Sequence, residues 1–197
     1  ATSFTAFSRY QEEAAWTWEQ QALTRARVVC GTPELTARIE QRIKETLTRK
    51  RDKIKLAFDV ANMRKRMAET HKGAPPFALK HMPGGMVDIE FIVQYLKLAY
   101  ADKHPEIIIP GTLKALPILA QNGLLEADAA HTLEETYRFW LDIQAMLSLT
   151  TVGEFNEEKA PAGLKYRLAK ILGEGADFAD LCEAIIKRAQ AARKIYA

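Results

Sequence analysis

Apolar residues recur at intervals of three and four along almost the whole 197-residue chain. No stretch alternates apolar with polar residues for long enough to form a half-buried β-strand. This period is that of the α-helix and excludes a fold built on a sheet. We therefore predict an all-α protein, a bundle of about seven helices joined by short loops. We expect one helical domain over residues 1–197, with long N-terminal helices over 1–70, a core over 77–152 and C-terminal helices over 153–197.

Glycine and proline residues predict where the helices begin and end. The first helix is expected from Ser3 to Val29, before a Gly-Thr-Pro sequence. The second is expected from Pro33 to Glu69, with a possible break near residues 49–52. The connector 71–76 contains two prolines and should not be helical. Further helices are expected after Gly85 and over 111–121, 126–151, 161–172 and 177–197.

The composition is that of an ordinary globular protein, with 48% hydrophobic and 27% charged residues. Cys30 and Cys182 have no second cysteine or histidine at ligand spacing, and the four histidines are scattered, so no metal site is expected. The sequence contains no signal peptide and no apolar run of membrane-spanning length. A cytoplasmic protein without membrane contact is the expectation.

Positive charge is concentrated between residues 42 and 66, although the net charge of the whole chain is only +3. This segment holds ten basic and three acidic residues, a local net charge of +7. A solvated helical face is favoured over a nucleic-acid site, because only Phe58 places an aromatic ring among the charges.

The helix that follows Gly84 and Gly85 is expected to be buried. Its polar residues Glu90, Gln94 and Lys97 form one narrow stripe, and apolar residues cover nearly all of the rest. Asp88 lies opposite that stripe and needs a partner. Two interpretations stay open. Asp88 is either a helix-start carboxylate, paired with an arginine, or part of a nucleotide, metal or active site with Glu90 and Lys80.

A second informative segment runs from Trp16 to Arg27. One interpretation is structural, with Trp18 in the core and the arginines Arg25 and Arg27 paired with Asp88, Glu90 or Glu19. The other is that at least one arginine binds a phosphate or carboxylate, since the guanidinium group matches such anions with two parallel hydrogen bonds. The spacing does not decide between them, and no phosphate-binding loop or nucleophile motif is present.

Together these two segments resemble a known family. The first motif, at 16–27, is Trp-Thr-Trp-Glu-Gln-Gln-Ala-Leu-Thr-Arg-Ala-Arg, and the second, at 80–91, is Lys-His-Met-Pro-Gly-Gly-Met-Val-Asp-Ile-Glu-Phe. Both are similar to motifs of the bifunctional glutamine synthetase adenylyltransferase/adenylyl-removing enzyme of bacteria. The resemblance covers residues 1 to about 150. The first motif looks like the version in the C-terminal half of that enzyme, which is associated with adenylylation.

The resemblance implies a helical, non-catalytic domain. In the family, each half has a nucleotidyltransferase domain, with a Gly-Ser pair and three acidic residues that hold Mg²⁺, followed by a helical domain. This chain resembles that helical domain and lacks the metal-binding acids. No catalytic residue or metal ligand is therefore expected in this fragment, which alone should be inactive and bind neither Mg²⁺ nor ATP, although the full-length enzyme uses both.

For the full-length protein, the resemblance implies transfer of AMP from ATP to a tyrosine of glutamine synthetase, and its removal, in the control of nitrogen assimilation. The implied partners are glutamine synthetase, the PII signal protein, glutamine as effector and the upstream nucleotidyltransferase domain. Nucleic acid is not expected. The positions that match the family's signature, with a possible role at a nucleotide or a domain interface, are Trp18, Glu19, Arg25, Arg27, Lys80, Gly84, Gly85, Asp88, Glu90 and Gln94. The hypothesis is that Gly84 and Gly85 abut the upstream domain, with Lys80, Arg25 or Arg27 near the nucleotide phosphates.

Two other interpretations compete with this one. The equivalent domain of the related PII uridylyltransferase is disfavoured, because the Trp-Thr-Trp-Glu motif belongs to the first family. A freestanding helical module would bind an acidic partner or RNA through its basic helix, and its binding would be sensitive to salt.

Overall fold

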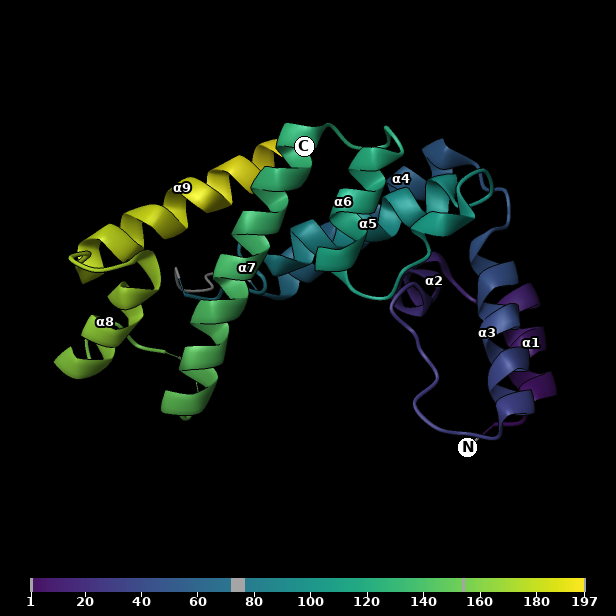
Figure 1. The fold of residues 1–197 in the computed structure, drawn as a ribbon, viewed down its shortest axis with the longest axis horizontal. Coiled ribbons are helices and arrows are strands. Elements are labelled where there is room, and N and C mark those ends of the chain that lie inside the picture. Colours follow the sequence, from purple (N-terminus) through teal and green to yellow (C-terminus); the bar gives the residue numbers. More distant parts are fainter. Residues whose placement is uncertain (1, 72–76, 154, 197) are drawn as a thin grey trace. The chain divides into compact units, whose positions relative to one another are not determined.

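A computed structural model describes residues 2–71, 77–153 and 155–196 (Figure 1). Within these ranges the chain is helical and contains no β-strand, so the predicted all-α class is confirmed. The described residues form nine α-helices and two short 3₁₀ segments, η1 (Pro105–Ile107) and η2 (Lys170–Leu172). The α-helices are α1 (Phe4–Glu13), α2 (Thr17–Leu23), α3 (Pro33–Leu47), α4 (Lys53–Thr70), α5 (Met86–Tyr100), α6 (Thr112–Gln121), α7 (Ala127–Thr150), α8 (Ala162–Ala169) and α9 (Phe178–Tyr196). Of the predicted connector 71–76, residues 72–76 lie outside the described residues.

The number of helices was predicted too low, at about seven, in part because the first predicted helix is divided. The chain leaves the helical conformation between α1 and α2, where the Glu19 carboxylate accepts a hydrogen bond from the backbone N–H of Trp16 at 2.9 Å. That bond caps the start of α2. The Tyr10 hydroxyl donates to the same carboxylate, which raises the pKa of Tyr10. Periodicity misses this break because it registers apolar spacing, not backbone caps.

The second predicted helix is also divided, near residues 49–52 as predicted. The Arg51 guanidinium donates to the main-chain carbonyls of Thr46, Leu47 and Arg49 at 2.7, 2.9 and 2.8 Å. It therefore satisfies carbonyl groups at the end of α3 that have no partner within the helix. Asp52 then accepts from the first backbone N–H groups of α4 at 2.9 and 3.1 Å. A cation and an anion in one short loop thus end one helix and start the next.

The described chain forms two compact units, whose boundaries fall within α4, α5 and α7. Unit 1 consists of Ala1–Arg66 and Glu90–Ala130, and unit 2 of Met67–Ile89 and His131–Ala197. The expectation of one domain over 1–197 stays a prediction. Within the part of the chain that the structure describes, no helix is both long and apolar enough to cross a membrane.

Unit 1 places α1 beside α3 (Figure 1) and buries leucine side chains of α3, α4 and α6. In unit 2, α8 packs against α9 (Figure 1), and the indole of Trp140 on α7 is fully buried. The ring of Phe77 lies 4.7 Å from the ring of Phe155 and 5.6 Å from that of Phe178, measured between centroids. Leucine and aromatic side chains therefore form the buried core of each unit.

Candidate functional site

Gly84 and Gly85 form a tight turn before α5, in unit 2. Gly84 has φ +77°, and a Cβ atom there would lie 1.9 Å from the carbonyl oxygen of Ala189 on α9. A Cβ atom at Gly85 would lie 2.3 Å from the carbonyl oxygen of Leu79. The two glycines are required because the protein's own backbone approaches them this closely.

The Asp88 carboxylate belongs to the same turn, and we call Gly84, Gly85, Asp88, Trp140 and Arg193 the glycine-turn cluster. Asp88 is fully buried. Its Oδ2 atom accepts from the Gly84 N–H at 2.7 Å and pairs with Nη1 of Arg193 at 3.3 Å. The Trp140 indole N–H donates to the Gly84 carbonyl at 3.3 Å. Asp88 is thus a helix-start carboxylate paired with an arginine, the first of the two interpretations offered for it.

The polar stripe of α5 begins at Glu90 and makes its contacts within unit 1. Glu90 pairs with Arg25 at 2.9 Å, and Gln94 accepts from the Gln21 side-chain amide at 3.1 Å. One turn further, the Lys97 ammonium donates to the Ile109 carbonyl at 2.5 Å. We call these residues the α2–α5 network. A stripe that would be solvated on an isolated helix here holds α2 and the loop after η1 against α5.

Lys97 is the most unusual titratable group of this network. Its side chain is almost completely buried, and its ammonium makes its hydrogen bond with a neutral carbonyl. Burial, with a smaller contribution from the nearby positive charge of Arg25, lowers the pKa of Lys97 to about 8. Lys97 lies on the predicted polar stripe but is not one of the positions that match the family's signature.

The remaining signature residues lie in several environments. One of the two interpretations of this segment placed Trp18 in the core, but its side chain is half exposed because the short helix α2 buries Gln21 and Leu23 instead. Arg27 is exposed on the rim of a cavity of about 350 Å³ between the end of α2, α3 and η1. Lys80 is exposed, and its carbonyl accepts from the Val87 N–H at 3.1 Å.

The structure gives the carboxylates of Asp88 and Glu90 different arginine partners. Because Asp88 and Glu90 are two residues apart on a helix, their side chains leave α5 on nearly opposite sides. Among the described residues, no group of three or more His, Cys, Asp and Glu side chains could hold a metal ion. Mg²⁺ requires oxygen ligands at octahedral positions, and the residues present do not fit such a site.

Sequence reasoning could not find two members of the glycine-turn cluster. Trp140 and Arg193 lie 56 and 105 residues from their partners in the chain. Arg193 has no local distinction beyond its place in the basic last turn of α9. Only the packing of α9 against the turn assigns it a role.

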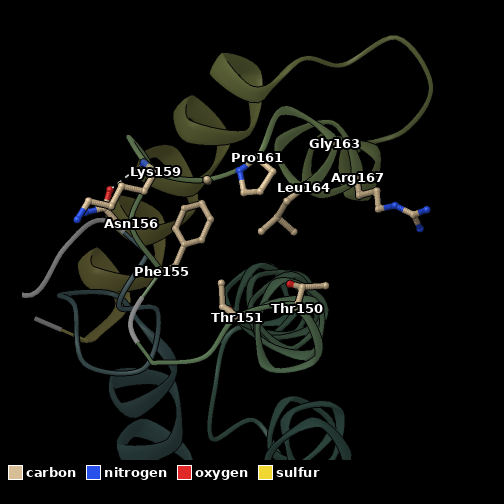
Figure 2. A pocket seen from close by; sticks show the side chains of 10 residues that line it. Thr150, Thr151, Phe155, Asn156, Lys159, Pro161, Gly163, Leu164 and Arg167 are labelled. Atoms are coloured by element: carbon tan, nitrogen blue, oxygen red, sulfur yellow. Dashed lines mark hydrogen bonds between the residues drawn. The ribbon is translucent and has the colours of Figure 1, made fainter.

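Unit 2 also contains a cavity that the sequence did not indicate, of about 470 Å³ (Figure 2). The Phe155 ring and the side chains of Pro161 and Leu164 point into it, while the Arg167 side chain extends away. The Thr150 and Thr151 hydroxyls donate to carbonyls one turn back on α7, so neither hydroxyl hydrogen is available to a ligand.

The fold is helical, and its two side-chain clusters consist of hydrogen bonds and ion pairs within the chain. Two family models match the sequence. The model described as glutamate-ammonia ligase adenylyltransferase matches residues 1–42, and the model described as GlnD PII-uridylyltransferase matches residues 37–194. The chain belongs to the family of the second model, while the Trp-Thr-Trp-Glu motif lies in the part that matches the first.

Curated relatives match almost the whole chain. The bifunctional glutamine synthetase adenylyltransferase/adenylyl-removing enzyme of Rhodopseudomonas palustris (strain ATCC BAA-98 / CGA009) is 41% identical over 190 residues, 96% of this chain and 19% of the relative. The enzymes of the same name from Bradyrhizobium diazoefficiens and Xanthobacter autotrophicus are 40% and 39% identical, over 96% and 92% of this chain and 19% and 18% of the relatives. The chain spans about a fifth of the length of these relatives, and the predicted resemblance is confirmed.

Proposed function

We propose that this chain is the helical domain that follows a nucleotidyltransferase domain in a cytoplasmic glutamine synthetase adenylyltransferase/adenylyl-removing enzyme. The observation that carries the proposal is the identity of about 40% over nearly the whole chain with enzymes of that name. The full-length protein would transfer AMP from ATP, with Mg²⁺, to a tyrosine of glutamine synthetase, and remove it. The regulators would be glutamine and the PII protein, and the name of the second family model supports the link to PII.

In this proposal the chain supplies shape and positioned cations, and the upstream domain supplies the metal-binding carboxylates. Arg25 is the strongest candidate for contact with the upstream domain. Its guanidinium is oriented by Glu90, yet half of its side-chain surface is exposed. A guanidinium held in place loses little conformational entropy when it binds a phosphate with two hydrogen bonds. Arg27, which is exposed two residues further on, is the second candidate.

For the glycine turn we propose a role other than the expected contact with the upstream domain. Gly84 and Gly85 are buried against the chain's own carbonyl groups, so we propose that they shape the turn and do not themselves contact another domain. Lys80 is the exposed cation near this turn. We propose that Lys80 provides the contact with the upstream domain on this unit.

The first experiment measures the size of the native polypeptide. An antibody raised against this chain should detect, in the source cells, a protein several times larger than 22.2 kDa. A band at 22.2 kDa would contradict the proposal and favour the freestanding helical module.

The second experiment tests the arginines in the full-length protein. Arg25→Ala should lower kcat/KM for AMP transfer by about 10- to 100-fold, since a charge-assisted contact with a phosphate is worth about 1.5–3 kcal/mol. The melting temperature should change by only a few degrees, because the lost ion pair is half exposed. Arg27→Ala and Lys80→Ala test the other two cations. Arg9→Ala is the matched control, because Arg9 is exposed on α1 and has no ion pair with any described residue. An Arg25→Ala enzyme as active as the Arg9→Ala control would overturn the role of Arg25.

A further inference from the structure

The basic segment 42–66 is only partly used to build unit 1. Arg42 and Arg49 both pair with Glu12 of α1, at 2.7 and 3.3 Å. The Arg51 guanidinium caps the end of α3, and the Lys53 ammonium lies 3.6 Å from the centroid of the Tyr100 ring. These four cations hold helices together and are explained by the fold.

The outer surface of α4 has no such explanation. Ile54 and Phe58, one turn apart, are 84% and 67% exposed. Ala57 and Ala61 extend the same exposed stripe between and beyond them. The free energy of large apolar side chains such as these falls when a partner surface removes them from water. We call this stripe, with the lysines around it, the α4 outer face.

Lysines border the stripe at both ends and along one side. Lys50 precedes α4, Lys55 lies beside Ile54, and Lys65 continues the stripe past Ala61; all three are exposed. Among the described residues none forms an ion pair with these three ammonium groups. The only carboxylates of 50–65 are already used, since Asp52 caps α4 and Asp59 accepts from the Thr17 hydroxyl at 2.7 Å. The α4 outer face is therefore apolar at its centre and positive at its rim.

We propose that the α4 outer face docks an acidic protein surface with apolar residues at its centre, belonging to the remainder of the full-length polypeptide. Two observations support this occupant. Unpaired lysines around an apolar centre are complementary to carboxylates around an apolar centre. The matched relatives are also about five times longer than this chain, so most of the polypeptide is available to form the opposing surface. The proposal rests on the proposed function in this respect.

Other occupants fit the α4 outer face less well. A second copy of the same face would bring Lys50, Lys55 and Lys65 against their own symmetry mates, and like charges in a two-fold interface repel. Single-stranded nucleic acid binds through aromatic side chains that stack on bases, whereas this stripe is mostly aliphatic. A cross-linking experiment distinguishes both of these occupants from the proposed one.

The experiment places the photoreactive amino acid p-benzoylphenylalanine at position 58 of the full-length polypeptide, which is then irradiated and digested for mass spectrometry. The exposed position tolerates the larger ring, and an unchanged melting temperature confirms folding. One cross-linked peptide should dominate, from the same polypeptide outside this chain, with acidic and apolar residues. Position 29 is the matched control, because Val29 is 79% exposed but lies outside the α4 outer face.

Charge reversal tests the rim. Lys55→Glu together with Lys65→Glu should lower the yield of that cross-link by about fivefold, whereas Lys103→Glu, at another exposed lysine, should leave it unchanged. The proposal is overturned by a yield at position 58 no higher than at position 29, by cross-links to nucleic acid, lipid or a second copy, or by insensitivity to the double charge reversal. Because the readout is a cross-link and not AMP transfer, failure of the docking and failure of the proposed enzymatic function are separate results.

Discussion

The Asp88 carboxylate accepts a hydrogen bond from the Gly84 N–H at 2.7 Å, and the guanidinium of Arg193, on the last helix, lies 3.3 Å from the same oxygen. A single buried oxygen thus connects the turn that starts α5 to α9. The backbone N–H donor and the helix start stabilise the negative charge locally, and Arg193 compensates it from a distant part of the chain. Several consequences of this arrangement and of the α2–α5 network can be measured.

Asp88→Asn should destabilise the protein by about 2 kcal/mol, because the amide keeps the shape and an acceptor oxygen but loses the negative charge that strengthens the hydrogen bonds from Gly84 and Arg193. Urea denaturation followed by circular dichroism measures the change. Asp128→Asn is the matched control, since Asp128 also lies in the first turn of a helix but is exposed. Equal losses in the two variants would contradict a specific role for the buried pair. In the full-length enzyme, AMP transfer that falls only as far as stability does would support a structural role.

Gly84→Ala should destabilise unit 2 by more than about 3 kcal/mol. The added Cβ would overlap the Ala189 carbonyl at 1.9 Å, and the residue would also be held at positive φ. The control is Gly163→Ala, where nothing lies within 4 Å of the new Cβ atom and the residue is helical. That change should stabilise α8 by about 0.5–1 kcal/mol. In thermal melts, the melting temperature should fall for Gly84→Ala and rise for Gly163→Ala.

Lys97 should make the stability of unit 1 depend on pH in the alkaline range. Its pKa is lowered to about 8 in the folded protein from 10.5. Between these values the unfolded chain binds more protons than the folded one, so the contribution of Lys97 to the free energy of unfolding rises from pH 8 to about pH 10.5 and is constant below pH 8. The full rise is on the order of 3 kcal/mol.

Other groups titrate in the same range, so the test compares the protein with its Lys97→Met variant. Relative to the variant, the unsubstituted protein should become more stable as the pH rises above 8. Urea denaturation at several pH values measures the difference in their free energies of unfolding. A difference that does not change with pH would show that Lys97 keeps its ordinary pKa.

The Arg25–Glu90 pair should contribute little to stability. A double-mutant cycle with Arg25→Ala and Glu90→Gln should give a coupling energy of about 0.5–1 kcal/mol, because the arginine is half exposed. The coupling should fall in 1 M salt, which screens exposed charges. A coupling above about 2 kcal/mol would mean that the pair is more deeply buried than the structure shows. The small value expected here leaves Arg25 free to act mainly in binding.

The local pattern of α5 predicted much of the candidate site. Because helix geometry places residues three and four apart on one side, the stripe of Glu90, Gln94 and Lys97 and the opposite position of Asp88 could be derived without tertiary information. The same reasoning failed for Trp18. The interpretation with Trp18 in the core assumed one helix over Ser3–Val29. A cap at Glu19 divides that segment, and the short helix α2 buries other residues.

The sequence by itself determined the helical period, the break near Arg51, the need for a partner at Asp88 and the two motifs that the relatives share. These features depend on residues within about one helical turn of each other, where backbone geometry limits the possible contacts. Only the tertiary structure decided that the partner of Asp88 is Arg193, 105 residues away. It also decided that the Ala189 carbonyl leaves no space for a Cβ atom at Gly84, and that Gln94 and Lys97 are buried. Such contacts arise when whole helices pack to bury their apolar faces, and no local pattern specifies which distant side chain the packing will bring there.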